Sequence, residues 1–204
     1  MNQVMTKALI LASKSAARLA MVEAAGIQLD SVAPMVDEES IRSVLQASGT
    51  SARDIADALA EAKAVKVSAR YPGALVLGSD QILQAEDGSI LSKSETPEDA
   101  RRTLAALSGK THRLFSAAVI AEGGRPVWRH VDKSVMTMRP LSDEFIDGYI
   151  AQYWEEIRPC VGGYRIEAEG AQLFAKVDGN QFSIMGMPLL AVLDYLRIRG
   201  NLPS

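Results

Sequence analysis

The sequence predicts an α/β fold, because short apolar runs alternate along it with segments that carry helix start and stop signals. Ala74–Leu77 is a continuous apolar run, and such runs are typical of strands buried on both faces of a sheet. Thr96 is followed by Pro97, Glu98 and Asp99, so a capping residue, a proline and two acids occur in the order that begins a helix. We therefore expect a sheet with helices packed on it.

Length and composition restrict the class of protein. The chain has 204 residues, of which 48% are hydrophobic and 23% charged, a composition that excludes disordered and fibrous chains. Its 22 basic and 25 acidic side chains give a formal net charge of −3, without the basic excess of proteins that wrap nucleic acid. The length alone admits one large domain or two small lobes.

The cysteine content and the N-terminal segment predict a soluble cytoplasmic protein. Cys160 is the single cysteine, which excludes an internal disulfide and suits a reducing compartment. Met1–Ala12 lacks the charged, apolar and cleavable parts of a signal peptide. No uncharged apolar run approaches the roughly 20 residues that a membrane helix needs. We expect neither a membrane nor a nucleic acid among its partners.

Strands and helices alternate in short segments near the start of the chain. Ala8–Ala12 is too short and apolar for a surface helix and predicts a strand, and Ala16–Ala25 predicts a helix stopped by Gly26. Leu29–Ala33 predicts a second strand, which leads into an acidic loop at Asp37–Glu39.

Capping and turn signals organise the rest of the chain. Ser51 and Asp54 have capping-box spacing and open a helix that Pro72-Gly73 must end. Asp87-Gly88 predicts a turn between two short strands, Ile82-Leu83 and Ile90-Leu91. The later expected elements are a helix from Thr96 to Gly109, strands at Leu114–Ala121 and Val127–Met138 around Gly123-Gly124, a helix capped by Ser142, a strand at Leu173–Val177 and a helix at Pro188–Arg199.

Charged and hydroxyl residues at the ends of these elements are the candidates for chemistry. Asp80 follows a buried strand, and it either serves a ligand site at that end or satisfies the donors of a turn. Ser13-Lys14-Ser15 is a phosphate site or a simple N-cap. Lys63 and Lys93, taken singly, are expected to be solvated surface lysines. Cys160 is a nucleophile or, in the favoured interpretation, a buried thiol.

Taken together, these positions resemble the Maf family of nucleoside triphosphate pyrophosphatases. Leu9–Arg18 is similar to the family's L-I-L-A-S-x-S-P-R-R signature, and Gly78–Gln81 resembles its G-[AS]-D segment. The further matches are Val36-Asp37-Glu38 with V-D-E, Glu61–Ala64 with E-K-A, Ile90–Ser94 with I-L-G-K-P, Leu107–His112 with L-S-G-K-T-H, Gly162–Glu167 with G-A-Y-G-I-Q and Met185–Leu189 with V-G-L-P-L. They run in family order from Leu9 to about Leu196, so residues 1–204 are expected to form a single Maf-like domain.

The resemblance implies a mixed, curved central sheet flanked by helices, with two lobes around a nucleotide-binding cleft. It implies hydrolysis between the α- and β-phosphates of a nucleoside triphosphate, which gives the monophosphate and pyrophosphate. Asp80 would be the catalytic base, and Glu38 and Asp80 would hold a divalent cation, Mg²⁺ or Mn²⁺. The residues expected to bind the substrate are Ser13, Ser15, Arg18, Lys63 and Lys93.

Departures from the family pattern occur beside the phosphate-binding residues. Ala16 and Ala17 replace the proline and the first arginine of the signature, which leaves Arg18 as the one remaining arginine of the pair. Ser92 and Ser94 replace the glycine and proline that flank the conserved lysine, which should loosen that loop.

Base selectivity is expected to depend on Ala17, Gln81 and Glu167. Gln81 and Glu167 resemble the branch of the family that is associated with 7-methyl-GTP. Glu167 could accept hydrogen bonds from guanine's ring N–H and exocyclic amine, a donor pair that thymine and uracil lack. That branch tends to carry a tryptophan in the signature loop, which is suited to stacking on a cationic base. This chain has Ala16 and Ala17 there, which counts against the methylated base. The resemblance therefore favours a guanine-type base, with the methylated form as the finer expectation.

One function of another class stays open at this point. A non-catalytic regulator of cell division would bind a nucleotide in the same cleft and act through a protein partner. The replacement of the signature's proline and first arginine by Ala16 and Ala17 is in favour of this alternative. A homodimer is a further expectation.

Overall fold

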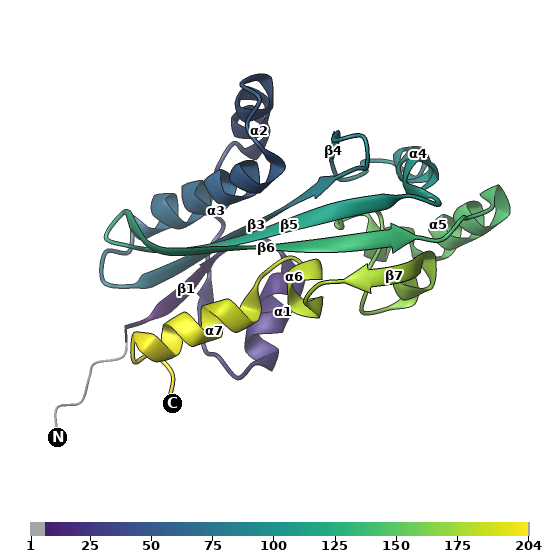
Figure 1. Cartoon of the computed structure of the whole chain (residues 1–204). Coiled ribbons are helices and arrows are strands. Elements are labelled where there is room, and N and C mark those ends of the chain that lie inside the picture. Colours follow the sequence, from purple (N-terminus) through teal and green to yellow (C-terminus); the bar gives the residue numbers. More distant parts are fainter. Residues whose placement is uncertain (1–6, 204) are drawn as a thin grey trace.

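The computed structural model describes residues 7–203. The first half of Met1–Ala12, the segment in which the sequence shows no signal peptide, lies outside the described residues. It has the mixed α/β architecture that was predicted, with a seven-stranded open sheet (Figure 1). The strand order is β2-β1-β3-β5-β6-β7, and β4 pairs with the end of β3. The strands are β1 Leu9–Ala12, β2 Asp30–Ser31, β3 Leu75–Gln84, β4 Ile90–Leu91, β5 Thr111–Glu122, β6 Arg125–Met138 and β7 Phe174–Asp178.

The helices follow the capping signals closely. Ser15, Ser51 and Thr96 each accept the backbone N–H of the residue three positions on, and Thr96 forms a complete capping box with Asp99. The helices are α1 Ala16–Ala24, α2 Glu38–Ala47, α3 Ala52–Ser68, α4 Pro97–Leu107, α5 Asp143–Ile157, α6 Gln181–Ile184 and α7 Leu189–Ile198, with a 3₁₀ turn at Glu169–Leu173.

Two expectations for the region around the sheet were wrong. Asp37–Glu39 is not a loop: Asp37 accepts the backbone N–H of Ser40 at 3.1 Å and caps α2, whose first turn contains both glutamates. Acids at that place favour the positive end of a helix as readily as they favour a loop. The strand predicted to end before Asp80 continues to Gln84, because β5 pairs with it along its whole length.

Although Asp80 lies inside β3, it is close to the end of the neighbouring strand β1. The parallel neighbour β1 stops where Ala12 pairs with Gly78, and β3 runs on, paired with β5 along its other edge and with β4 only at Leu83 and Gln84. Asp80 lies opposite Ala117, two residues beyond the last β1 pair. The carboxylate is therefore just past the carboxyl end of β1, where open α/β sheets bind their ligands.

Side chains of alternating residues face opposite sides of the sheet, as the period of a strand requires. On β5, Ala117 and Val119 belong to the core formed with α3, whereas Ala118 and Ile120 belong to the core formed with α1 and α7. Figure 1 shows α3 above the long β5–β6 hairpin and α7 below it. The sheet between α3 and α7 is thus buried on both faces.

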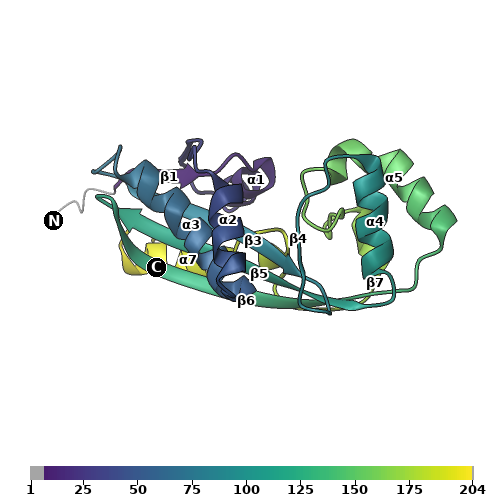
Figure 2. The ribbon, with the colours of Figure 1, turned by 90° about the horizontal axis from the view of Figure 1, so that it is seen from above.

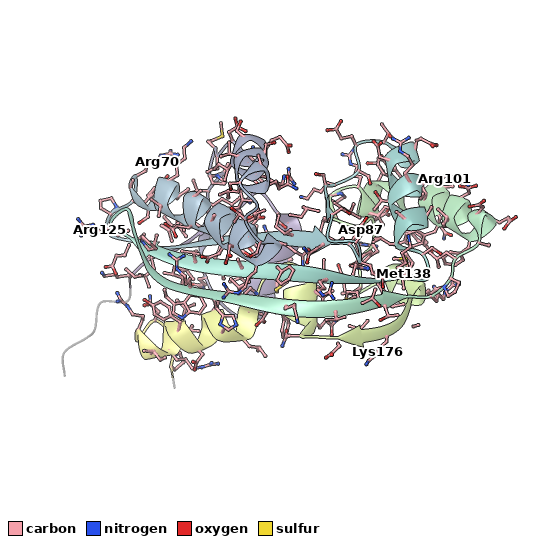
Figure 3. The ribbon with its side chains drawn as sticks, turned by 45° about the horizontal axis from the view of Figure 1, so that its top comes forward. Arg70, Asp87, Arg101, Arg125, Met138 and Lys176 are labelled. Carbon is pink, nitrogen blue, oxygen red and sulfur yellow. The ribbon has the colours of Figure 1, made fainter. Side chains whose placement is uncertain are left out.

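A third core cluster lies at the other end of the sheet, between α4, α5 and the ends of β3, β5 and β6. Seen from above, α2 and α3 lie over one part of the sheet and α4 and α5 over the other (Figure 2). Arg101 of α4 bridges to Asp143 and Asp147 of α5 at 3.2 and 2.8 Å, and it lies at the opposite end of the molecule from Arg125 at the hairpin tip (Figure 3). These two groups of helices are the two lobes that were expected.

Within residues 7–203, the structure contains no helix of the length and apolar character needed to cross a membrane.

Candidate functional site

A cleft of about 380 Å³ lies between the two lobes, within the usual size range of small-molecule sites. One lobe contributes the β1–α1 turn (residues 13–18), Glu38 of α2 and Lys63 of α3. The other contributes Lys93 and the segment 159–167, and residues 184–186 close one wall. Of the site residues selected from the sequence, all but Asp80 line this cavity, and Asp80 is connected to it through Lys63.

Lys63 lies at the centre of the charged part of the cleft. Its Nζ is 2.6 Å from Asp80 Oδ1 and 2.8 Å from Glu38 Oε2. Only 4% of Lys63 and 7% of Asp80 are exposed, so the interpretation of Lys63 as a solvated lysine was wrong. The fully formed pair shows that this lysine serves the carboxylates of the cleft rather than solvent.

Close packing of α3 on β3 makes that pair possible. A Cβ on Gly78 would lie 2.2 Å from the carbonyl oxygen of Ala60 and 2.7 Å from the backbone nitrogen of Ala64, so only glycine fits there. Gly78 and Asp80 lie on the same face of β3, two residues apart. The contact at Gly78 thus lets α3 approach closely enough for Lys63 to reach Asp80.

Arg18 is fixed by backbone acceptors from two different elements. Its Nε donates to the carbonyl of Gly186 at 2.8 Å, and its Nη1 donates to the carbonyl of Ser79 at 3.0 Å. Burial lowers the pKa of Arg18, and the negative charges of Asp80 and Glu38 act in the opposite direction. The guanidinium is held in place beside the two carboxylates before any substrate binds.

Ser13 and Ser15 lie in the turn that leads into α1. The hydroxyl of Ser15 caps this helix by accepting the N–H of Arg18 at 3.3 Å, and Ser13 Oγ accepts the N–H of Ser15 at 3.0 Å. The N-cap role is thus confirmed for Ser15. Both residues also line the cleft, where the N-terminus of α1 favours an anion.

Lys93 approaches the same centre from the other lobe. It forms an isolated antiparallel bridge with Val161, which ties the segment after β4 to the segment before Arg165. Lys93 is exposed, as expected of a surface lysine, yet partial desolvation in the cleft lowers its pKa, with a further lowering by the charges of Arg18 and Lys63 and an opposing effect of Asp80 and Glu38. Three cations therefore converge on one part of the cleft, against two carboxylates.

Gln81 is oriented by a network that sequence analysis did not find. Three acceptors lie within hydrogen-bond distance of the two N–H groups on its Nε2: Ser116 Oγ at 2.9 Å and the carbonyls of Ser183 and Ile184 at 3.0 and 2.9 Å. Asp132 in turn accepts a hydrogen bond from Ser183 Oγ. The contacts with Ser116, Ser183 and Ile184 hold the amide nitrogen of Gln81 against β5 and α6. Short α6 carries no periodic pattern from which its contact with Gln81 could be predicted.

The far part of the cleft contains Cys160, Tyr164, Arg165 and Glu167. Cys160 is half-buried rather than fully buried. Its pKa is raised by burial and by Glu167, and lowered by Lys93 and Arg165. Tyr164 is held from behind by His112, whose Nε2 lies 2.7 Å from the tyrosine oxygen. The sequence motif around His112 identified this histidine but not its partner.

Glu38 and Asp80 are the carboxylates available for a metal ion. Within the part of the chain that the structure describes, no three His, Cys, Asp or Glu side chains are grouped to hold one. Two carboxylates fit Mg²⁺ or Mn²⁺, because such ions are commonly bound by one or two carboxylates together with phosphate oxygens of the substrate. An ion at this place would share both carboxylates with Lys63.

Comparison with known proteins shows the family to which the chain belongs. Residues 8–198 match the family described as Maf-like protein. The chain belongs to the Maf-like family. Among its relatives, the "Nucleoside triphosphate pyrophosphatase" of Sphingopyxis alaskensis is 51% identical over 96% of this chain and 99% of the relative. That of Ruegeria pomeroyi is 50% identical over 96% of this chain and 98% of the relative. The relative of the same name from Caulobacter vibrioides is 46% identical over 94% of this Maf-like chain and 96% of its own.

A more distant likeness exists among solved structures. The nucleoside-triphosphatase or dITP/XTP pyrophosphatase of Mycobacterium abscessus aligns over 96% of this chain and 97% of its own, at 13% identity and a TM-score of 0.41. That score is too low to support an inference about this Maf-like protein.

Proposed function

We propose that this Maf-like protein hydrolyses a nucleoside triphosphate between its α- and β-phosphates, giving the monophosphate and pyrophosphate. The observation that carries the proposal is that Arg18, Lys63 and Lys93 line one cleft, with the buried Asp80 paired directly to Lys63. Relatives about half identical over nearly the whole chain bear the name of this activity. Catalysis of phosphoryl transfer depends chiefly on positioning and on neutralising charge at the phosphate oxygens, which this arrangement supplies.

In this proposal, the cations hold and neutralise the triphosphate. Arg18 is already fixed by two carbonyls, so little side-chain entropy is lost when it meets a phosphate. Ser13, Ser15 and the N-terminus of α1 add hydrogen bonds to phosphate oxygens. Lys63 links this group to Asp80, since its ammonium touches the carboxylate.

Asp80 would accept the proton of the attacking water. One of its oxygens is bound by Lys63, a residue that lines the cleft, and this contact restricts the orientation of the carboxylate. Glu38 and Asp80 would also hold a divalent cation, which when bound makes a water molecule more acidic and neutralises phosphate charge. The buried surroundings of Asp80 exclude bulk water, which strengthens these electrostatic interactions.

For the base, we propose a guanine-type ring. Glu167 lines the cleft and could accept hydrogen bonds from the ring N–H and the exocyclic amine together. Pyrimidines offer no such pair of donors, so the carboxylate would be poorly matched. Glu167 alone would also attract the cationic ring of 7-methylguanine, which keeps 7-methyl-GTP among the candidates.

A panel of triphosphates tests the proposal. GTP, 7-methyl-GTP, ATP, dTTP and UTP are each incubated with the protein and Mg²⁺ or Mn²⁺, and both products are identified. We expect pyrophosphate and the monophosphate, with kcat/KM highest for a guanine-type base. Orthophosphate with the diphosphate would contradict the bond assignment. Nucleotide binding with no product at all would favour the non-catalytic regulator.

A further inference from the structure

Arg165 is a cation of the cleft that the proposed phosphate chemistry does not use. It stands at the place of the second glycine in the G-A-Y-G-I-Q element. Its Nη2 lies 3.2 Å from Glu169 Oε2, and its side chain is 30% exposed. Among residues 7–203, no hydrogen-bond partner exists for its buried Nε. A guanidinium has five N–H donors, so Arg165 keeps donors beyond its ion pair with Glu169.

The backbone of Arg165 is held tightly. A Cβ on Gly170 would lie 2.4 Å from the carbonyl oxygen of Arg165 and 2.7 Å from its nitrogen. The 3₁₀ turn Glu169–Leu173 therefore packs directly on this residue through a glycine. An arginine with a fixed backbone and one anchored terminal nitrogen is well prepared to bind a planar ligand in a single geometry.

Arg165 and Glu167 line the cleft from the lobe opposite the one that contributes Arg18 and Lys63. Glu167 raises the pKa of the Cys160 thiol, whereas Arg165 and Lys93 lower it, so all three charges lie near this residue. Lys93 lines the cleft as well, and its bridge to Val161 places it beside the segment that leads to Arg165. A nucleotide with its phosphates at Arg18 and Lys63 would extend its base past Lys93 toward Arg165 and Glu167.

We propose that Arg165 is a specificity-determining residue that donates hydrogen bonds to O6 and N7 of a guanine base, while Glu167 accepts from its N1–H and amine. This inference rests on the proposed pyrophosphatase function. An arginine fork matches the O6 and N7 acceptors of guanine, and a carboxylate matches its donor edge. Arg165 would thus bind the acceptor edge of guanine, and Glu167, two positions further along the chain, would bind its donor edge.

This assignment selects the unmethylated base. Methylation at N7 removes one of the two acceptors and places a positive charge on the ring beside the guanidinium. The attraction of Glu167 for the cationic ring is then opposed by Arg165. GTP is accordingly the expected substrate over 7-methyl-GTP, in contrast to the branch that Gln81 and Glu167 resemble.

The test compares kcat/KM for GTP, 7-methyl-GTP and 7-deaza-GTP, which lacks only the N7 acceptor. The wild-type protein should prefer GTP to both analogues by about tenfold or more. Arg165→Met should reduce this preference to near unity, mainly through KM for GTP, and Arg165→Lys should restore part of it. Arg102→Met, which removes an ion-paired arginine from the surface of α4, should leave the ratios unchanged.

Ratios between substrates are independent of the fraction of protein that is folded, so a destabilised variant still reports the base preference. Faster turnover of 7-methyl-GTP than of GTP by the wild-type protein would overturn the assignment without any variant. An equal loss on all three substrates in Arg165→Met would also overturn it, because it would show a purely structural role. Failure of the pyrophosphatase function would give a different result from failure of the base assignment, because the wild-type protein would then release no pyrophosphate from any of the three substrates.

Discussion

Lys63 Nζ lies 2.6 Å from Asp80 Oδ1, and both side chains are almost completely buried although 17 residues separate them in the sequence. Their contact joins a helix and a strand at the point where α3 crosses β3. Glu38 completes the group at 2.8 Å from the same ammonium. The chemistry proposed for the cleft depends on this arrangement, and it is open to test by substitution.

Lys63→Met should remove activity and stability together. The buried Asp80 would lose its partner, and breaking such a pair costs about 3 kcal/mol or more in the free energy of unfolding. Loss of the charge should lower kcat/KM by about a hundredfold. Urea unfolding and pyrophosphate release measure the two effects, with Lys176→Met on the exposed part of β7 as a control (Figure 3).

A double variant tests the stability effect of the pair. Lys63→Met with Asp80→Asn contains no unpaired buried charge, so it should recover much of the lost stability and none of the activity. Stability no higher than that of Lys63→Met alone would show that the unpaired Asp80 is not the cause of the loss, and recovery of turnover would contradict the roles of both residues.

Gly78→Ala should destabilise the protein through the contact between α3 and β3. The new Cβ would lie 2.2 Å from the carbonyl of Ala60, so the helix must move, at a cost of about 1–3 kcal/mol in the free energy of unfolding. Movement of α3 would also displace Lys63 from Asp80 and lower kcat. Gly73→Ala is the matched control, because its added Cβ meets nothing within 4 Å. Similar denaturation midpoints for the two variants would contradict the close packing.

Stability should fall as the pH drops below about 6.5, because of His112. Burial lowers the pKa of this histidine to about 4. Between its ordinary value of 6.5 and about 4 the unfolded chain binds the proton and the folded protein does not, so the free energy of unfolding decreases with falling pH. The total loss is about 3 kcal/mol, from about 1.4 kcal/mol per pH unit. Urea titrations from pH 7.5 to 4 measure it, and His112→Phe should flatten the curve in that interval. An unchanged slope in the variant would assign the effect to other groups.

Removal of divalent cations should abolish activity while the fold survives. Glu38 and Asp80 are proposed to hold the ion together with the substrate, and no cluster of three metal-ligating side chains occurs in the described part of the chain. EDTA should therefore stop pyrophosphate release and leave the Tm unchanged. Activity should return with Mg²⁺ or Mn²⁺. Full turnover in the chelator would exclude the metal role of both carboxylates.

Local signals in the sequence predicted most of the elements correctly. Capping residues such as Ser51, Thr96 and Ser142 begin their helices as expected, because a cap is formed within four consecutive residues. The same locality explains the failure at Asp37, where acids suit both a loop and a helix start. Strand order and the extension of β3 past Asp80 depend on pairing with distant segments, which no local pattern reveals.

The candidate site was predicted less by local chemistry than by resemblance. Lys63 and Lys93, taken singly, have the pattern of surface lysines, and only the motif order marked them as functional. The structure brings them together through tertiary contacts at Gly78 and Val161. Arg165 departs from the family motif and therefore had no signal of its own; its place in the cleft comes from the packing of the turn that follows it.

Turnover of Asp80→Asn is the most direct test of the central claim that this cleft hydrolyses triphosphates with Asp80 as the base. The amide keeps the shape of the side chain but does not take a proton at neutral pH. We predict a fall in kcat of about a hundredfold or more, measured as pyrophosphate release, with nucleotide affinity within a fewfold of the wild-type value. Near-normal kcat in this variant would contradict the role of Asp80 as the base.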